Sequence, residues 1–321
     1  MLQFGVVGTN VISEWFAGAC RATGGRAEAV AVCSRELTRA RDFADRIGAP
    51  RAFDDLAAMA QAVDAVYIAS PNALHREQAV LAAEAGRHVL VEKTMGTSLP
   101  QVQSIFAAAE RAGVVAMEAM RNVHTPAHRL LREALPRLGT LRHARFEKLQ
   151  YSSRYDRFRA GVTLNAFDPA LGNSALADIG VYCLQPALDL FGAPLRTVGA
   201  SLWLSNGFEA GGSLLLDYRT LVVDLAYSKV ASGLGPSTIT GEDASLSFDD
   251  PGELSRVVLH ERGGRETVLL DGPPVGPADT MVHEVLAFAD QVDAGATDPH
   301  WRELSLLARR VMDEQLGRRT S

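Results

Sequence analysis

The chain has 321 residues, which exceeds the usual size of a single hydrophobic core and favours two domains. Hydrophobic residues make up 47% and charged residues 22%, a composition that excludes a disordered or fibrous chain. A net charge of -6 without a Lys/Arg tract argues against nucleic acid or an anionic membrane as the main partner.

Neither a signal peptide nor a membrane span is expected. The chain opens without a basic, apolar leader, and it contains no run of about 18 apolar residues. Cys20, Cys33 and Cys183 are widely spaced and form no C-x-x-C pair, so they indicate reduced thiols and neither a disulfide frame nor a metal site. These features favour the cytoplasm and predict no bound metal.

Short β-rich runs alternate with helical patterns over about the first 120 residues, which is typical of βαβ units with a parallel sheet covered on both faces. The expected strands are 3–7, 28–33, 65–69, 88–91 and 114–117. The expected helices are 12–23, 38–47, 54–60, 73–85 and 100–112, several of them followed by a glycine.

The pattern changes beyond residue 120. After a helical stretch at 126–138, longer alternating strands lie within 213–227 and 244–248, which predicts an antiparallel sheet with one wetter face. A helix at about 169–190 interrupts the strands, and helices at 281–292 and 301–316 close the chain. We therefore expect a dinucleotide-binding domain at 1–120 and a substrate and oligomerisation domain at 121–321. The closing helix, about 300–317, can pack back on the first domain.

The N-terminus, Phe4-Gly-Val-Val-Gly-Thr-Asn-Val-Ile-Ser13, places a strand, a tight polar turn and a helix start in succession. Because the first N–H groups of a helix lack intrahelical partners, a pyrophosphate can dock there. The residues concerned are Gly8, Thr9, Asn10, Val11 and Ile12. Gly8 fits the first glycine of G-x-G-x-x-G, but Asn10 and Ser13 replace the other two, so the turn alone identifies nothing. Asparagine tolerates left-handed conformations, so we expect the turn to survive, with Ser13 small enough for helix packing.

The second expected strand ends in Cys33-Ser34-Arg35, where an acidic residue would mark NAD. A hydroxyl and a guanidinium suit a 2′-phosphate instead, and Arg39 adds a second cation one helical turn later. This pattern favours NADP(H), with NAD(H) still open. The alternative is that Ser34 caps the following helix and the arginines are merely solvated.

Polar residues also follow two further strands, and the carboxyl ends of parallel strands are where ligands collect. Ser70-Pro71-Asn72 comes after one strand, with His75 in the next helical turn, and Asn72 is either a cofactor ligand or an ordinary N-cap. Glu92-Lys93 comes after the strand expected at 88–91, so the Lys93 ammonium can act as a fixed positive charge at cofactor and substrate. The alternative is that the two residues form a surface ion pair.

Asp178 and Tyr182 are four residues apart with Gly180 between them, so on a helix they share one face and leave room for a close neighbour. A tyrosine acts as a general acid near neutral pH only where its anion is stabilised, and Lys93 is the candidate cation. The alternative is that Asp178 caps a helix while Tyr182 packs in the core.

The order of these motifs resembles the Gfo/Idh/MocA oxidoreductases, named for glucose-fructose oxidoreductase and inositol dehydrogenase, over nearly the whole chain. The resemblance implies an α/β fold: an N-terminal Rossmann domain with a doubly wound parallel sheet and a C-terminal α+β domain with a large open, mostly antiparallel sheet. Asp-Ile-Gly-Val-Tyr looks more like the dimeric dihydrodiol dehydrogenase and anhydrofructose reductase branch, which uses NADP(H). Thr94 replaces the usual proline after Lys93.

By this resemblance, the chain transfers a hydride between NADP(H) and a hydroxyl or carbonyl carbon of a sugar, cyclitol or diol. Tyr182 exchanges the proton, Lys93 stabilises the tyrosine anion and polarises the oxygen, and Asp178 orients these groups or the substrate. Arg121 is a further candidate contact, although a solvated arginine is more common. A nucleotide-binding sensor of the same fold is the main alternative, and a methyltransferase is disfavoured by Ser34-Arg35.

The loop at 151–173, with Arg154, Tyr155, Arg157, Phe158 and Arg159, is expected to shape the substrate pocket. Alternating residues of one long strand predict an apolar sheet face that buries either a partner subunit, giving a dimer or tetramer, or the domain's own helices. Those residues are Leu214, Leu216, Tyr218 and Thr220.

Overall fold

A computed structural model describes residues 1–162 and 164–317. The chain divides into two compact units, one made of Met1–Arg121 with Pro277–Leu306 and one of Asn122–Gly276 with Leu307–Ser321. The segment Pro277–Leu306 thus belongs to the same unit as the N-terminal half. The functions predicted for the two domains stay predictions.

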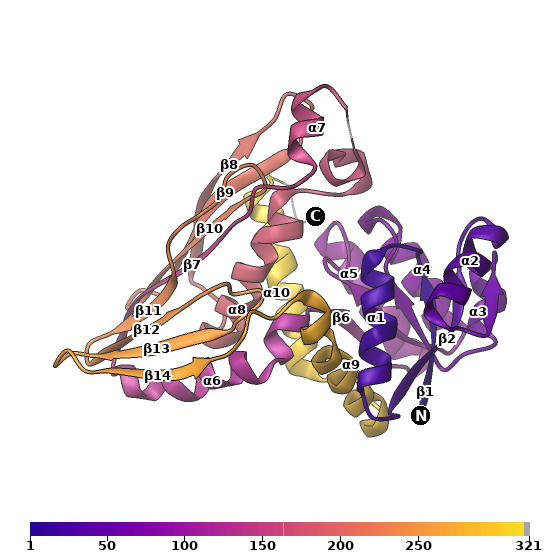
Figure 1. Ribbon diagram of the computed structural model, residues 1–321, viewed down its shortest axis with the longest axis horizontal. Coiled ribbons are helices and arrows are strands. Elements are labelled where there is room, and N and C mark those ends of the chain that lie inside the picture. Colours follow the sequence, from indigo (N-terminus) through magenta and orange to yellow (C-terminus); the bar gives the residue numbers. More distant parts are fainter. Residues whose placement is uncertain (163, 318–321) are drawn as a thin grey trace. The chain divides into compact units, whose positions relative to one another are not determined.

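The first unit is built on a six-stranded parallel sheet in the order β3-β2-β1-β4-β5-β6. Figure 1 labels β1, β2 and β6 of this sheet. Its strands are β1 (Leu2–Val7), β2 (Ala27–Cys33), β3 (Arg51–Phe53), β4 (Ala65–Ile68), β5 (His88–Glu92) and β6 (Ala116–Ala119). Its helices are α1 (Val11–Ala22), α2 (Leu37–Ile47), α3 (Leu56–Ala60), α4 (Asn72–Glu84), α5 (Leu99–Ala112) and α9 (Pro277–Ala294). The order reverses between β1 and β4, which is where doubly wound sheets bind dinucleotides.

Helices cover both faces of this sheet, so its strands are apolar on both sides. On one face α1, α2 and α9 share a core with Phe4, Phe16 and Phe288. On the other, α3, α4 and α5 share a core with Met59 and Ile105. This buried double layer fixes the carboxyl ends of the strands, from which the candidate ligand-binding loops leave.

The second unit is built on an eight-stranded sheet in the order β14-β13-β12-β11-β7-β10-β9-β8; within the described part of the chain, β7 and β10 pair in parallel and its other neighbouring strands are antiparallel. Its strands are β7 (Leu141–Leu149), β8 (Arg196–Trp203), β9 (Glu209–Asp217), β10 (Val222–Ser228), β11 (Ser237–Gly241), β12 (Ala244–Phe248), β13 (Arg256–Glu261) and β14 (Glu266–Asp271). Its helices include α6 (Pro126–Ala134), α7 (Tyr155–Arg159) and α8 (Val181–Phe191), the last preceded by the π-helical turn η5 (Leu176–Gly180). The closing helix α10 (Pro299–Gln315) spans the division between the two units.

The apolar sheet face that contains Leu214 and Leu216 is covered by helices of this same unit. Both side chains are buried, and α8 and η5 pack on β10 and β7 next to them. The neighbouring Leu215, on the opposite face, is 46% exposed. The prediction of a one-sided face is therefore confirmed for Leu214 and Leu216, which the domain's own helices cover. It is wrong for Tyr218 and Thr220, because β9 ends at Asp217 and Thr220 is exposed in the turn that follows.

Several predicted boundaries differ from the structure. The strand β3 was not predicted, because it has only three residues and none is fully buried. The helix expected at about 169–190 begins as short 3-10 turns and the π-helical η5, and α8 itself starts only at Val181. Within the described ranges, no helix is both long enough and apolar enough to cross a membrane.

Candidate active site

The turn after β1 requires glycine at position 8. Gly8 has φ 111, and a Cβ there would lie 2.7 Å from the backbone oxygen of Ala69. The Gly8 amide donates to the Cys33 carbonyl at 3.2 Å, which ties the ends of β1 and β2 together. Backbone in this conformation, next to a neighbouring strand, leaves no space for a side chain.

Asn10 does not adopt the left-handed conformation that we expected. Its φ is -111 and its ψ is 178, so it is extended and serves as the N-cap of α1. Its Oδ1 accepts from the Ser13 amide at 3.1 Å, and its Nδ2 donates to the Ala69 carbonyl at 2.7 Å. Asparagine therefore replaces glycine here because it caps the helix and ties the turn to β4. Thr9, Val11 and Ile12 lie at the same helix start, with Val11 exposed, and the small Ser13 is buried as expected.

Ser34, Arg35 and Arg39 follow the carboxyl end of β2. The N-cap of α2 is Glu36, so the alternative in which Ser34 caps that helix is wrong. Arg35 and Arg39 are exposed, and neither makes an ion pair within residues 1–162 and 164–317. Two unpaired guanidinium groups at this strand end are available to an anionic group.

The loop after β4 is held by a buried histidine. His75 is fully buried, with Nδ1 3.0 Å from the Thr94 carbonyl oxygen and Nε2 2.8 Å from that of Ser70. Burial lowers the pKa of His75. His75 thus lies between the loops after β4 and β5, where its neutral ring can donate to one of the two carbonyls, and it is not itself an exposed ligand. The N-cap of α4 is Pro71 and Asn72 is the first helical residue, so Asn72 is not the ordinary N-cap of the alternative reading.

Glu92 and Lys93 do not form a surface ion pair. Glu92 is 8% exposed, and its two oxygens accept from the Tyr67 hydroxyl at 2.5 Å and from the Lys93 amide at 3.2 Å. Burial raises the pKa of Glu92, against the opposing effects of the Tyr67 hydrogen bond and the Lys93 charge. The buried carboxyl group of Glu92 therefore holds the backbone amide of Lys93 in place.

Arg121 is buried, so its interpretation as a solvated arginine is wrong. It is 5% exposed, and its Nη1 donates to Thr280 Oγ1 at 2.7 Å. Glu284 of α9 lies in the same cluster, where burial, and then the charge of Glu92, raise its pKa well above the usual range, with Arg121 opposing. Arg121 thus helps to balance buried carboxyl groups. Thr280 and Glu284 lie about 160 residues further along the chain, and no sequence pattern pointed to them.

The predicted residues of the second unit lie at the start of α8. Asp178 lies in η5, where the N-cap is Ala175, so Asp178 is not a cap. Its Oδ2 pairs with Lys229 Nζ at 2.8 Å, and 44% of its side chain remains exposed. Gly180 is required for the close approach that we expected, since a Cβ there would lie 2.8 Å from Tyr227 Cγ on β10.

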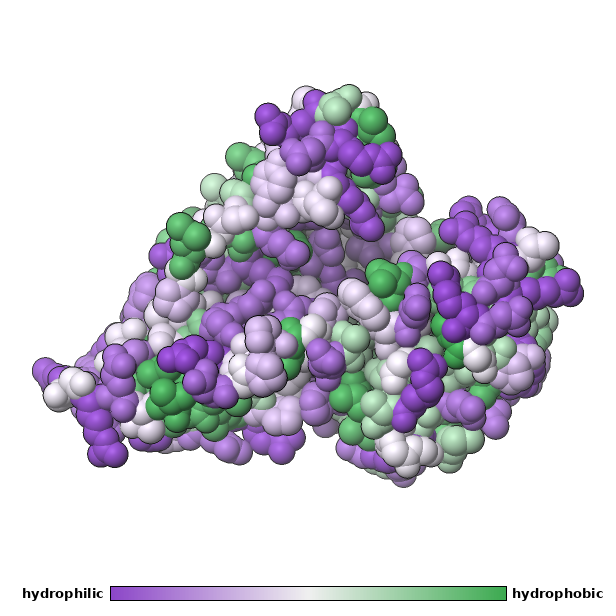
Figure 2. Space-filling model, in the orientation of Figure 1, coloured by the Kyte–Doolittle hydropathy of each residue, from purple (hydrophilic) through white to green (hydrophobic). Residues whose placement is uncertain are grey.

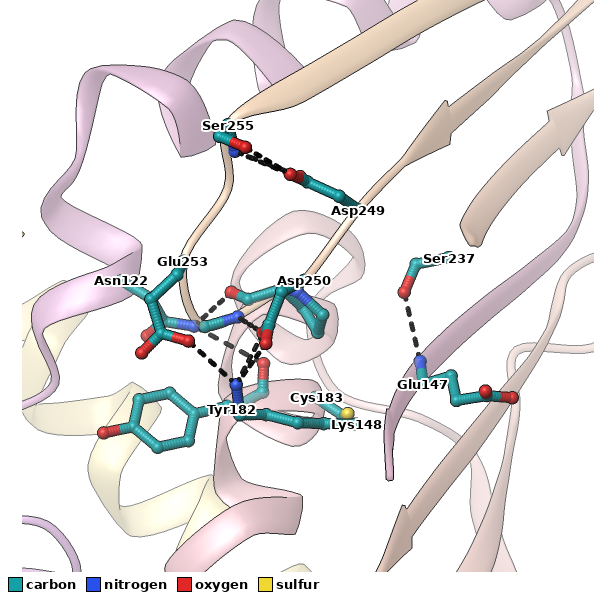
Figure 3. A network of polar contacts seen from close by, with 12 residues as sticks. Asn122, Glu147, Lys148, Tyr182, Cys183, Ser237, Asp249, Asp250, Glu253 and Ser255 are labelled. Carbon is teal, nitrogen blue, oxygen red and sulfur yellow. Dashed lines mark hydrogen bonds and ion pairs between the residues drawn. The ribbon is translucent and has the colours of Figure 1, made fainter. Parts of the chain in front are cut away.

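Tyr182 lies against a lysine that the sequence analysis missed. Lys148 Nζ, from β7, is 5.4 Å from the centroid of the Tyr182 ring. It donates to Asp250 at 2.6 Å and to Glu253 at 3.0 Å. Burial lowers the pKa of Lys148, but the two carboxylates outweigh burial, and the net direction is upward. In Figure 3 the Tyr182 hydroxyl points away from this network.

The backbone of Tyr182 is held as well. Asn122 Nδ2 donates to the Pro251 carbonyl at 2.9 Å and, more weakly, to the Tyr182 carbonyl at 3.4 Å. The same loop also supplies the carboxylates that hold Lys148 (Figure 3). Tyr182 is 7% exposed, so it is buried as the alternative of core packing expected, and its ring and backbone are also contacted by polar side chains of this unit.

The loop at 151–173 divides into structural and exposed residues. Tyr155 and Phe158 pack on the buried cluster of Phe167 and Phe208, so their rings support the loop. The arginines on and beside α7 are exposed, and Figure 2 shows strongly hydrophilic residues over this end of the unit. They are Arg154, Arg157 and Arg159.

Comparison with known proteins identifies the family. Residues 2–120 match a family described as oxidoreductases with an NAD-binding Rossmann fold. The chain is 39% identical over 319 residues to a scyllo-inositol 2-dehydrogenase (NADP(+)) from Bacillus subtilis (strain 168), covering 98% of this chain and 96% of that protein. The chain belongs to the Gfo/Idh/MocA oxidoreductase family.

Two further relatives agree with this assignment. The oxidoreductase is 30% identical to a trans-1,2-dihydrobenzene-1,2-diol dehydrogenase from Mus musculus over 222 residues, 68% of this chain and 65% of that protein. The fold of this chain matches that of a solved 3-ketoreductase from Actinomadura kijaniata in complex with NADP and TDP-benzene. The TM-score is 0.84 at 26% identity, and the match covers 97% of this chain and 96% of the other. The predicted family and fold class are confirmed, and the protein is an enzyme with an NAD(P)-binding Rossmann fold.

Proposed function

We propose that this oxidoreductase transfers a hydride between NADP(H) and a hydroxyl or carbonyl carbon of a sugar, cyclitol or diol. The observation that carries the proposal is the setting of Asp178 and Tyr182, each held by a buried lysine of its own unit. The extensive similarity to a scyllo-inositol 2-dehydrogenase (NADP(+)) supports the polyol class.

NADP(H) is the preferred cofactor in this proposal, with NAD(H) as the other possibility. The residues fit a dinucleotide, because Gly8 permits the tight turn after β1 and α1 presents its N-terminus directly after that turn. Arg35 and Arg39 would bind the 2′-phosphate. When bound, the nicotinamide accepts or donates the hydride.

The chain's own residues would supply the proton chemistry. Tyr182 exchanges the proton of the substrate hydroxyl, and its ring is fixed by Lys148 and its carbonyl by Asn122. Lys93, anchored through its amide by Glu92, polarises the substrate oxygen. Asp178 accepts a hydrogen bond from a substrate hydroxyl and thereby orients it.

We further propose a homo-oligomer, a dimer or tetramer, formed through the outer face of the eight-stranded sheet. Val198, Leu202, Leu215 and Val222 of β8, β9 and β10 are between 40% and 52% exposed. These exposed apolar side chains share their face with charged residues, among them Asp217 and Asp224, and such a mixed face suits contact with a second copy of the chain. The cytoplasm is the proposed location, in keeping with three free and buried cysteines.

The experiment that tests the proposed function is a turnover screen with purified enzyme. NADP⁺ and NAD⁺ are each offered with scyllo-inositol, other cyclitols, aldoses and trans-dihydrodiols, and reduced cofactor is followed by absorbance. We expect turnover with at least one polyol, faster with NADP⁺. Tyr182→Phe should lose that turnover while it still binds NADPH, whereas undiminished turnover in this variant contradicts the mechanism.

A further inference from the structure

A buried lysine holds the carboxylate of Asp178 from inside the second unit. Lys229 directly follows β10, and its side chain is 4% exposed. Its Nζ makes two contacts of equal length, at 2.8 Å to Asp178 Oδ2 and at 2.8 Å to the Ala166 carbonyl oxygen. The ammonium group therefore joins η5 to the loop that contains Ala166.

Two aromatic rings also lie close to Lys229. Its Nζ lies 5.0 Å from the ring centroid of Phe167 and 5.3 Å from that of Phe208, and both rings are fully buried. Rings of this kind attract a cation but do not neutralise it. A lysine in such a site is costly unless an anion pairs with it, and among the described residues Asp178 is the carboxylate in direct contact with it.

The strand register shows why this lysine reaches the start of α8. Tyr227 of β10 pairs with Lys148 of β7, and side chains two residues apart on a strand share a face. Continuing β10 by one residue places Lys229 on the same face as Tyr227, the face on which η5 packs. The same sheet face thus supplies one ammonium to Asp178 and one to Tyr182.

We propose that Lys229 is a positioning residue that holds Asp178 oriented as a hydrogen-bond acceptor for a neutral, hydroxylated substrate. This inference rests on the proposed function, because it takes Asp178 to contact the substrate. One carboxylate oxygen is bound from within, while 44% of the side chain faces outward. A carboxylate held in this way accepts from a hydroxyl and repels an anionic group, so it favours polyols over sugar acids.

A double-mutant cycle tests the proposal. Lys229→Met, Asp178→Asn and the double variant are compared with the unaltered enzyme, by kcat/KM for an active polyol and by the Kd for NADPH. Each single variant should lose about 100-fold in kcat/KM, since a misplaced orienting group costs about that much. The double variant should lose no more than Asp178→Asn, because Lys229 acts through Asp178, and NADPH binding should stay within about twofold.

The outcomes separate this inference from the proposed function. If Asp178→Asn and Tyr182→Phe impair turnover but Lys229→Met does not, or if the two losses multiply in the double variant, the inference is overturned and the proposed function stands. If Asp178→Asn is fully active, both this inference and the proposed role of Asp178 in orienting the substrate are wrong. Lys229→Arg serves in the same cycle where Lys229→Met does not fold, and it should recover part of the loss because it keeps the charge.

A matched control comes from another buried ion pair in the second unit. Arg309 Nη2 and Asp313 Oδ1 are 2.9 Å apart on α10, and both side chains are about as buried as Lys229. Arg309→Met should destabilise the protein without changing kcat/KM for the polyol. An equal loss of kcat/KM in Arg309→Met would mean that Lys229→Met reports only general destabilisation, which would overturn the proposal.

Discussion

Replacing Glu209 by glutamine should change how stability depends on pH. Glu209 is 1% exposed, and its Oε2 accepts from the Leu176 amide at 2.9 Å. Burial raises the pKa of Glu209 from 4.5 to about 7, against the opposing effects of its hydrogen bonds and of Lys229. Between pH 4.5 and about 7, Glu209 therefore stays protonated in the folded protein, whereas it has already lost its proton in the unfolded chain.

The sign and size of the effect follow from this difference. As the pH rises from 4.5 to about 7, the unfolded chain is stabilised by ionising first, so the folded protein loses stability and does not regain it above pH 7. The full loss corresponds to about 3 kcal/mol. Because glutamine does not ionise, Glu209→Gln should gain about 3 kcal/mol relative to the unaltered protein between pH 4.5 and pH 8.

The assay is urea unfolding at both pH values, followed by tryptophan fluorescence and circular dichroism. Glu133→Gln, an exposed glutamate of α6, is the matched control and should show the same difference from the unaltered protein at both pH values. A Glu209→Gln difference that also stays constant between the two pH values refutes the reasoning, because Glu209 would then be ionised in the folded protein.

Three further predictions concern individual contacts. Gly8→Ala should cost about 2 kcal/mol or more in urea unfolding and weaken NADPH binding. Gly113→Ala is the control, because Gly113 also has a positive φ but nothing lies within 4 Å of its added Cβ. It should cost about 1 kcal/mol and leave NADPH binding unchanged. Equal losses of stability and NADPH affinity in the two variants would contradict the close approach at Gly8. Arg35→Ala should raise the NADPH Kd at least about tenfold and leave the NADH Kd unchanged, as measured by fluorescence titration, whereas an equal change for both would exclude 2′-phosphate binding. Lys148→Met should destabilise the protein by about 2 kcal/mol at pH 7, because it leaves Asp250 and Glu253 without their cation; no change in the urea midpoint would contradict a stabilising ion pair.

The first unit was largely predictable from the sequence because its signals are local. Apolar runs, helix starts and terminal glycines such as Gly48 and Gly113 lie within a few residues of the structure that they determine. The three-residue β3 carries too few residues for a pattern. Asn10 shows a subtler limit, because its identity fits both a left-handed turn and a helix cap, and only the backbone angles decide.

The surroundings of the candidate site were not predictable in the same way. Lys148 meets Asp250 about 100 residues later, and Lys229 meets Asp178 about 50 residues earlier. These pairs depend on the register of β7 and β10 and on the packing of η5 against them, which no short sequence window contains. A lysine in the sequence looks like a solvated surface residue until the fold buries it.

Direct transfer of deuterium tests the central claim, hydride transfer involving Tyr182, most directly. The enzyme is incubated with NADP⁺ and a cyclitol deuterated at its hydroxyl-bearing carbons, and the reduced cofactor is examined by mass spectrometry. NADPH should carry deuterium at the nicotinamide ring, and Tyr182→Phe, which should still bind NADPH, should form little deuterated NADPH. Reduced cofactor without deuterium, or label formed equally fast by Tyr182→Phe, would contradict the account.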